Sequence, residues 1–195
     1  MSYYKNLGEY IETLEREGLL FRVTRPINKD TEMHPLVRWQ FRGLKEEQRR
    51  AFLFENIHDS KGGKYDIPVL IGGLAASEKI YALGLKCNEE EVEAVWSQAL
   101  EKPIEPVTVT EADVQDVVIA GEELVASGGL YKLPIPISTP GFDNAPYLTA
   151  GCWITRDPET AVRNMGVYRG QIKGPLKTSV MWGSLKHSAI HWETA

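Results

Sequence analysis

Cysteine is scarce in this sequence, because its 195 residues include only Cys87 and Cys152. The two cysteines lie far apart and form no CxxC pair, which excludes a disulfide framework and favours a reducing, cytoplasmic compartment; a single disulfide stays open. Basic charge is also limited, since 22 Lys and Arg against 27 Asp and Glu give a formal net charge of -5. Such a chain has no general electrostatic attraction to nucleic acid or to anionic membranes.

Long apolar runs are missing as well. The amino-terminal stretch MSYYKNLGEYIETLEREG has no apolar run of signal-peptide length. No other segment approaches the roughly 18 to 20 apolar residues that span a bilayer. Internal repeats and low-complexity tracts are absent too. We therefore expect a soluble globular chain, without a membrane or nucleic-acid partner, that forms one large domain or two small ones.

The first half of the sequence mixes helical and strand patterns. Asn6 is a candidate cap for a helix that ends near Gly18, and further helices are expected at 33–44, after Ser77 and after Asn88. Strand patterns occur at three places, which are 19–23, 51–57 and 67–73. The helix after Asn88 has one apolar stripe that we expect to lie in the core, made of Val92, Val95, Trp96 and Ala99.

The second half predicts a β-meander followed by a helix. A strand is expected at 147–155, closed by a turn at Asp157 and Pro158, and it is followed by strand patterns at 162–172 and 177–182. Ser184 is the candidate cap of a last helix. We predict an α/β (α+β) protein with two domains, a mixed α/β domain over residues 1–110 and a β-rich domain over 111–195.

The stretch NMGVYRGQ places Asn164 and Arg169 inside one of these strand patterns. They differ by five positions, so strict alternation puts them on opposite faces of a flat strand, although a twist or bulge at Gly166 would bring both to one ligand. A structural interpretation, with Asn164 as a turn residue and Arg169 as a solvated arginine, remains open.

Two further features favour a binding site in this half. His187 and His191 are four residues apart and so share one helix face, which suits a shared metal or one functional histidine, but also two packed or exposed histidines. The second feature is a locally basic region, which consists of Arg163, Arg169, Lys173, Lys177 and Lys186. Such a cluster suits a phosphorylated or carboxylated ligand, and a solvated charged face is an equal alternative.

Several of these motifs together resemble one family. YLTAGCWITRDPETAVRNMGVYRGQI, with the histidine-bearing helix after it, is similar to the start of the flavin-binding domain of UbiD-type decarboxylases. The opening NLGEYIETLEREGLLFRV, then FLFENI and PVLIGG before YALGL, resemble the amino-terminal domain of the same family. The resemblance implies a split β-barrel for residues 111–195. It also implies prenylated FMN and Mn²⁺ as cofactors, with K⁺ as an optional further ion.

The resemblance assigns roles to individual residues. Asn164 and His187 match the ligands of a divalent ion that bridges to the cofactor phosphate. The segment along the prenylated flavin is matched by Val167, Tyr168 and Arg169, with Lys186 beside His187. Arg169 also matches the arginine that orients the substrate carboxylate, which gives it a catalytic role, whereas the role of His191 stays open.

The implied activity is non-oxidative, reversible decarboxylation of an aromatic, hydroxybenzoate-like acid or of an α,β-unsaturated acid. The implied partners are that small carboxylic acid and a flavin prenyltransferase that supplies the cofactor. Family members are more than twice this long, and the residues past this sequence carry the proton donor and a third metal ligand. We therefore expect the 195-residue chain to be inactive alone. We also expect it to form a homo-oligomer or to join a partner subunit that carries the missing half. The alternative is a non-catalytic flavin- or anion-binding subunit.

Overall fold

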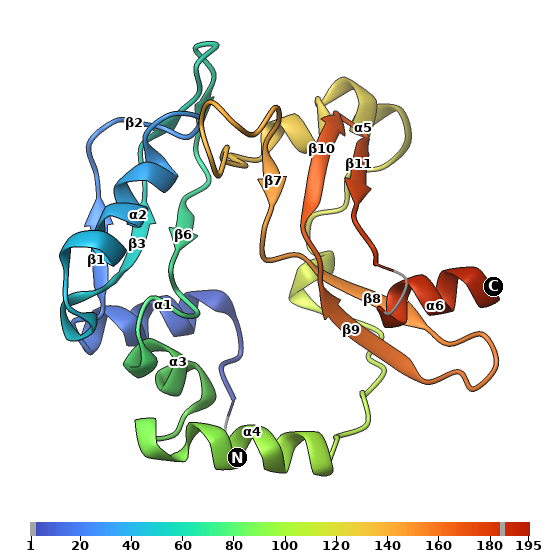
Figure 1. Cartoon of the computed structure of the whole chain (residues 1–195). Coiled ribbons are helices and arrows are strands. Elements are labelled where there is room, and N and C mark those ends of the chain that lie inside the picture. The colour runs from blue at the N-terminus through green and yellow to red at the C-terminus, as the bar shows by residue number, and fades with distance from the viewer. Residues whose placement is uncertain (1–2, 184–185) are drawn as a thin grey trace.

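The computed structural model describes residues 3–183 and 186–195. Helices and sheets are mixed throughout, so the α/β prediction is confirmed. Figure 1 shows the sheets of the first half on one side and those of the second half on the other, with a long exposed segment leading from α4 toward the second group. Within the described residues, no helix combines the length and the apolar character that a membrane crossing requires.

The first helix, α1 (Leu7–Arg16), begins where the sequence predicts. The Asn6 side chain accepts a hydrogen bond from the backbone N–H of Glu9, at 2.9 Å, which satisfies one of the free donors of the first turn. Tyr10 and Leu14 are buried on its inner face. The Tyr10 hydroxyl donates to the carbonyl of Gly73, at 2.6 Å, and burial raises the pKa of this phenol to about 12. Tyr10 therefore joins α1 to the turn before α3.

The first half contains two small sheets. One has the order β1-β3-β6, with β1 (Leu20–Val23) parallel to β3 (Ala51–Phe54) and β3 antiparallel to β6 (Val69–Ile71). The other has the order β2-β4-β5, made of β2 (Ile27–Asn28), β4 (Ile57–His58) and β5 (Lys64–Tyr65). The single strand predicted at 51–57 is therefore wrong. It divides at the exposed residues Glu55 and Asn56, and its two parts pair in different sheets.

Two hydrophobic clusters hold this half together. Helix α2 (Met33–Gly43) packs Met33 and Val37 against Phe54, while α3 (Glu78–Leu85) packs Ile80 against the buried side of α1. Ser77 caps α3 as predicted, because its hydroxyl accepts from the N–H of Ile80. These contacts bury apolar side chains on both sides of the β1-β3-β6 sheet.

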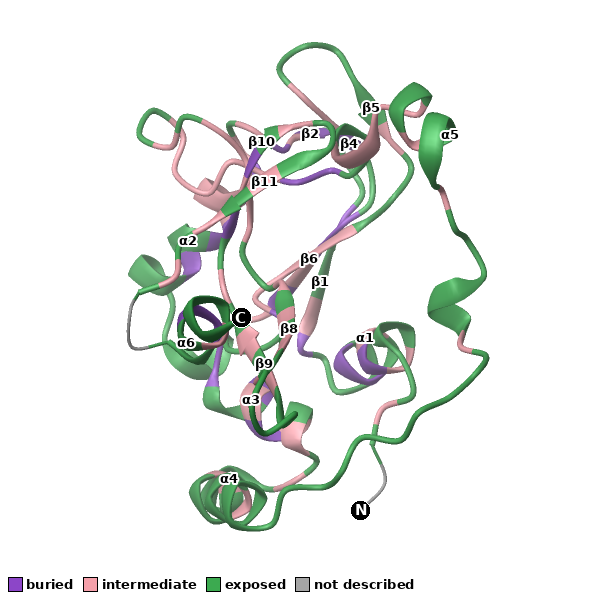
Figure 2. Cartoon of the chain, turned by 90° about the vertical axis from the view of Figure 1, so that its right-hand side faces the viewer, coloured by how far each residue is buried: buried purple, intermediate pink, exposed green. Residues whose placement is uncertain are grey.

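The apolar stripe after Asn88 is not part of the core. Asn88 caps the short 3-10 turn Glu89–Glu91, which leads into α4 (Val92–Glu101). No residue of α4 is buried, and Trp96 is 51% exposed. Figure 2 shows α4 as an almost wholly exposed helix. The core prediction for Val92, Val95, Trp96 and Ala99 is wrong, because α4 packs mainly against α3 and the turn before it, and none of its residues is buried.

The second half begins with a 3-10 turn at Asp113–Gln115, the short helix α5 (Gly121–Ala126) and a further 3-10 turn at Gly129–Lys132. It continues with five strands, which are β7 (Tyr147–Leu148), β8 (Cys152–Arg156), β9 (Arg163–Val167), β10 (Gly170–Gly174) and β11 (Lys177–Val180). They form a three-stranded sheet in the order β11-β10-β7 and a two-stranded sheet of β8 and β9.

Two strand predictions in this half therefore need correction. The pattern at 147–155 divides into β7 and β8, which pair with β10 and β9 respectively. The pattern at 162–172 divides after Val167, where Tyr168 and Arg169 cross from one sheet to the other. The last helix, α6, spans His187–Thr194, and the predicted cap Ser184 lies outside the described residues.

Candidate functional site

The β8–β9 hairpin is fixed by its turn. The Asp157 carboxylate accepts hydrogen bonds from the backbone N–H groups of Thr160, at 3.1 Å, and of Glu159, at 2.8 Å. These bonds lower the pKa of Asp157, because they favour the charged carboxylate. Ala161 adopts φ +61°, and the N–H of Asp157 donates to the carbonyl of Val162. The turn predicted at Asp157 is thus confirmed and sets the pairing of the two strands.

This pairing places Thr155 directly opposite Asn164. The register runs from Arg156 opposite Arg163 to Cys152 opposite Val167 without a shift, so the bulge considered at Gly166 does not occur. Side chains alternate along both strands, and the face with Thr155 and Asn164 is half-buried. The residues on the other face are exposed, among them Ile154, Met165 and Val167.

Helix α6 lies against the half-buried face of the hairpin (Figures 1 and 2). The Nδ1 atom of His187 lies 2.9 Å from Oδ1 of Asn164, although the two residues are 23 positions apart. One turn later, Nδ1 of His191 lies 2.9 Å from the hydroxyl of Thr155. The two imidazole rings are nearly parallel, at 15°, with centroids 6.4 Å apart. The hairpin and the helix therefore form a four-residue polar cluster.

Thr155 is a member of this cluster that the sequence reasoning missed. The available signal was the turn at Asp157, because a hairpin that is symmetrical about this turn pairs Thr155 with Asn164. The role of His191 was open from the sequence. Its ring nitrogen bonds to the Thr155 hydroxyl, and its ring lies beside that of the predicted metal ligand His187.

The crossing between β9 and β10 contains Tyr168 and Arg169. The ring of Tyr168 folds back over Gly166, where an added Cβ would lie 2.6 Å from the ring carbon Cζ. Its ring also makes an edge contact with Trp182, with centroids 6.5 Å apart. The indole N–H of Trp153 donates to the Tyr168 carbonyl at 2.8 Å. The crossing is thus held by aromatic side chains, and only glycine fits at position 166 without moving Tyr168.

Arg169 is exposed at the start of the second sheet. Its guanidinium carbon lies 6.0 Å from the ring centroid of Tyr147, and Nη2 lies 3.9 Å from the sulfur of Met181. Lys186 is the exposed N-cap residue of α6. Over residues 3–183 and 186–195, no hydrogen bond or ion pair connects Arg169 or Lys186 with Asn164 or His187. Of the predicted site residues, the structure brings together Asn164 and His187.

The Asn164–His187 pair has the donor chemistry of a metal site. Oδ1 of Asn164 and Nδ1 of His187 lie 2.9 Å apart, close enough for one ion to be bound by both atoms when Nδ1 carries no proton. An amide oxygen and an imidazole nitrogen both suit divalent ions such as Mn²⁺. The Nδ2 atom of Asn164 is buried and has no hydrogen-bond partner among the described residues. The residues of the pair therefore fit a metal ion, although in the described chain no group of three or more His, Cys, Asp and Glu side chains is arranged to hold one.

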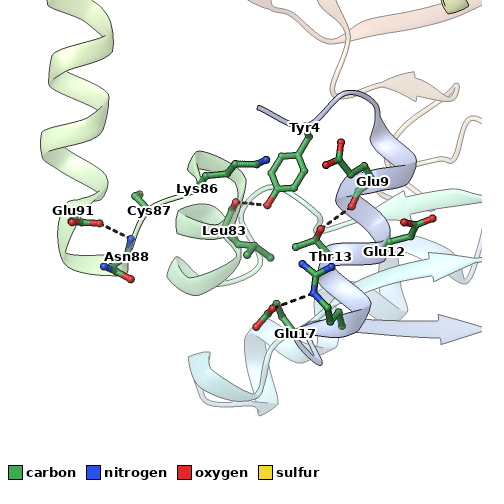
Figure 3. Close-up of a pocket in the computed structure, with 11 residues that line it drawn as sticks. Tyr4, Glu9, Glu12, Thr13, Glu17, Leu83, Lys86, Cys87, Asn88 and Glu91 are labelled. Atoms are coloured by element: carbon green, nitrogen blue, oxygen red, sulfur yellow. Dashed lines mark hydrogen bonds and ion pairs between the residues drawn. The ribbon is translucent and has the colours of Figure 1, made fainter. Parts of the chain in front are cut away.

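A separate cleft lies between α1 and the end of α3 (Figure 3). It has a volume of about 500 Å³, and its walls include Tyr4, Glu12, Arg16 and Lys86. The Tyr4 hydroxyl donates to the Leu83 carbonyl at 2.9 Å, as the dashed line in Figure 3 shows. None of the predicted site residues lines this cleft, and its chemistry is that of a polar surface groove. We take the hairpin cluster as the candidate site.

The candidate site is thus an amide and an imidazole that meet where a helix covers a small sheet, in a protein of the mixed α/β class. Residues 11–100 match the 3-octaprenyl-4-hydroxybenzoate carboxy-lyase N-terminal domain, and residues 106–195 match the Rift-related domain of the same carboxy-lyase. The chain belongs to the UbiD family, which confirms the resemblance seen in its motifs.

Solved structures agree with this family. The chain is 28% identical to the UbiD-class enzyme HmfF from Pelotomaculum thermopropionicum, solved with FMN, over 97% of this chain and 39% of HmfF, with a TM-score of 0.80. An evolved dimeric form of HmfF, solved with prFMN, is 26% identical over 98% of this chain and 41% of that one, with a TM-score of 0.76.

The apo 3,4-dihydroxybenzoic acid decarboxylase from Enterobacter cloacae shares the fold at 21% identity, over 100% of this chain and 40% of that one, with a TM-score of 0.80. The chain thus spans about 40% of the length of these structures.

Proposed function

We propose that this chain takes part in the non-oxidative, reversible decarboxylation of an unsaturated carboxylic acid with prenylated FMN. The observation that carries the proposal is the contact of Asn164 with His187 in a chain of the UbiD family. Structures of HmfF with FMN and with prFMN support a flavin cofactor. The carboxy-lyase that gives the family its description acts on a hydroxybenzoate, which supports an aromatic acid as the substrate class.

In this proposal Asn164 and His187 hold a divalent ion, Mn²⁺ with K⁺ as an optional second ion, that neutralises the cofactor phosphate. The prenylated flavin, when bound, supplies the electron sink that loss of CO₂ from an unsaturated carbon requires. Lys186 lies next to His187 at the start of α6, where its ammonium group adds positive charge for a phosphate. In this proposal Val167, at the end of β9, and Tyr168, in the crossing to β10, contact the flavin.

Arg169 is the residue that we assign to the substrate carboxylate. A guanidinium holds a carboxylate through two parallel hydrogen bonds, which fixes both its distance and its orientation. Arg169 is suited to this task because its side chain is exposed and its contacts with Tyr147 and Met181 are weak ones that a carboxylate can replace. By holding the carboxylate, Arg169 sets the angle at which the bond to CO₂ breaks.

The remaining assignments follow from the same proposal. We place the end of the amino-terminal domain near residue 110 and the start of a split β-barrel after it. We propose a cytoplasmic location for the chain. The partners are the acid substrate, a flavin prenyltransferase and either further copies of the chain or a subunit that supplies the proton donor. An evolved form of HmfF is dimeric, which supports the oligomer.

The experiment combines cofactor and metal retention with activity. The protein is purified from cells that make prenylated flavin, and the absorption spectrum and the Mn²⁺ content are compared for wild type, Asn164→Ala and His187→Ala. Both variants should lose Mn²⁺ and most of the flavin absorption. The matched control is Asn144→Ala, because Asn144 is an exposed asparagine that only receives a hydrogen bond from Gln171. Retention of flavin and Mn²⁺ in Asn164→Ala at the wild-type level would show that the site is assigned wrongly.

The rival function is a non-catalytic flavin- or anion-binding subunit. One observation favours it, namely that no group of three acidic or metal-binding side chains accompanies Asn164 within residues 3–183 and 186–195. Release of CO₂ separates the two functions when it is measured with the further chain or subunit that supplies the proton donor. Under that condition, flavin binding with CO₂ release from a hydroxybenzoate supports the decarboxylase, and flavin binding without turnover of aromatic or α,β-unsaturated acids supports the non-catalytic subunit.

A further inference from the structure

Helix α6 is a short element with few polar contacts to the sheet below it. It spans His187–Thr194, and its inner side carries the small buried residues Ser188 and Ala189. In the described part of the chain, its side-chain hydrogen bonds to the hairpin are the two made by His187 and His191. Small residues allow the helix to approach the sheet closely, but they do not fix its rotation about its own axis.

The two histidine contacts have matching geometry. Residues four apart on a helix have Cβ atoms about 5–6 Å apart, and directly opposite residues of an antiparallel pair are about 4.5–5.5 Å apart. His187 and His191 are such a helical pair, and Asn164 and Thr155 are such a strand pair. The helix therefore makes two adjacent bonds of 2.9 Å, one to each strand. The two ring planes are nearly parallel, and each ring uses its Nδ1 atom for the contact with the hairpin.

We propose that Thr155 and His191 are positioning residues, which fix α6 so that His187 meets Asn164. The inference rests on the proposed function, because it assigns to Thr155 and His191 an effect on the metal that Asn164 and His187 would hold. Besides the burial of Ser188 and Ala189 and the contact of the Trp192 ring with Trp182, the bond of His187 to Asn164 is one polar contact that holds α6 on the hairpin. The bond of His191 to Thr155, on the neighbouring strand, is a second such contact one turn later, and it limits the movement of the His187 ring.

Threonine is well suited to this position. Its side chain is β-branched and so has few rotamers on a strand, and Thr155 is half-buried beneath α6. Its hydroxyl can donate to or accept from a ring nitrogen, so the contact is compatible with either neutral form of His191. Groups that orient a metal ligand typically change metal affinity by 10- to 100-fold when they are removed.

The test uses pairs of variants that differ in one group. Thr155→Val removes the hydroxyl but keeps the shape, and Thr155→Ser keeps the hydroxyl. His191→Leu removes the ring nitrogens, and His191→Asn keeps a polar group near the position of Nδ1. The control is Thr13→Val, because the Thr13 hydroxyl donates a hydrogen bond of 2.8 Å to the Glu9 carbonyl in α1, far along the chain from the hairpin.

Two quantities are measured on the purified protein with FMN present. The dissociation constant for Mn²⁺ is obtained by electron paramagnetic resonance, and the exposure of α6 by amide hydrogen exchange of its peptide. We expect Thr155→Val and His191→Leu to weaken Mn²⁺ binding about tenfold and to speed exchange in α6. The serine and asparagine variants should restore most of the affinity, and the Thr13 variant should bind Mn²⁺ as wild type does.

The outcomes separate this inference from the proposed function. If Asn164→Ala binds Mn²⁺ as tightly as wild type, the proposed metal site is wrong and the positioning role falls with it. If Mn²⁺ binding depends on Asn164 but Thr155→Val binds with unchanged affinity, only the positioning role is wrong. Faster exchange in α6 with unchanged Mn²⁺ affinity also overturns it, because Thr155 would then serve stability alone.

Discussion

Replacing Gly166 by alanine tests how the crossing at Tyr168 is built. A Cβ at position 166 would lie 2.6 Å from both Cζ and the hydroxyl oxygen of Tyr168. Carbon atoms pack best at about 3.5–4.0 Å, so the methyl overlaps the ring by about 1 Å. The ring is the free end of a side chain and can swing away, but it then leaves its edge contact with Trp182.

If the ring moves, the protein loses the aromatic pair, at a cost of about 0.5–1.5 kcal/mol; if the ring stays, the extra methyl costs about 1–3 kcal/mol. We expect Gly166→Ala to lower the free energy of unfolding by about 1–3 kcal/mol, measured by urea unfolding with circular dichroism. Gly43→Ala is the control, because a Cβ on Gly43 meets no atom within 4 Å.

A double-mutant cycle locates the cause. In Tyr168→Ala the ring is absent, so adding Gly166→Ala to that variant should change the unfolding free energy by less than about 0.5 kcal/mol. If the alanine costs the same with and without the tyrosine ring, the overlap is not the reason for glycine at position 166. The flavin absorption of the single variant then reports whether a displaced Tyr168 also weakens the cofactor site.

Three other predictions concern the first half. Tyr10→Phe should destabilise the protein by about 1–3 kcal/mol in urea unfolding, because the buried carbonyl of Gly73 loses its donor, whereas the exposed Tyr3→Phe should not. Burial lowers the pKa of His34, with a smaller contribution from a nearby arginine, so the native state resists protonation of this ring. The free energy of unfolding should therefore fall as the pH drops below about 6.5, and His34→Gln should make this dependence on pH weaker. Trp96→Ala should change the unfolding free energy by less than about 0.5 kcal/mol, and a loss typical of a core tryptophan, about 3–5 kcal/mol, would contradict the exposed position of α4.

Local signals predicted the element ends well. Asn6 and Ser77 cap helices because a short polar side chain reaches the free N–H groups of the next turn, which depends only on neighbouring residues. The hairpin turn at Asp157 is local in the same sense. Strand pairing is not local, and the divisions at Glu55 and at Tyr168 result from partners distant in sequence.

The candidate site was only partly predictable for the same reason. The motifs named Asn164 and His187, and the structure brings these two together. Thr155 was missed because a lone threonine in a strand has no chemical signal until its pairing with Asn164 is known. The apolar stripe of α4 has the period of a core helix, but the period states only which residues share a face and not whether another element covers it.

The polar cluster on the hairpin has a consequence for folding. Its hydrogen bonds join residues only 23 and 36 positions apart, whereas the bond from Arg38 to the Ser138 carbonyl, which ties the two halves together, spans 100 positions. Contacts of short sequence separation have a small loop-closure cost and form quickly. The hairpin and α6 can therefore assemble before the two halves dock. Mutations that loosen the docking at Arg38 should change how the halves meet while the pairing of His187 with Asn164 persists.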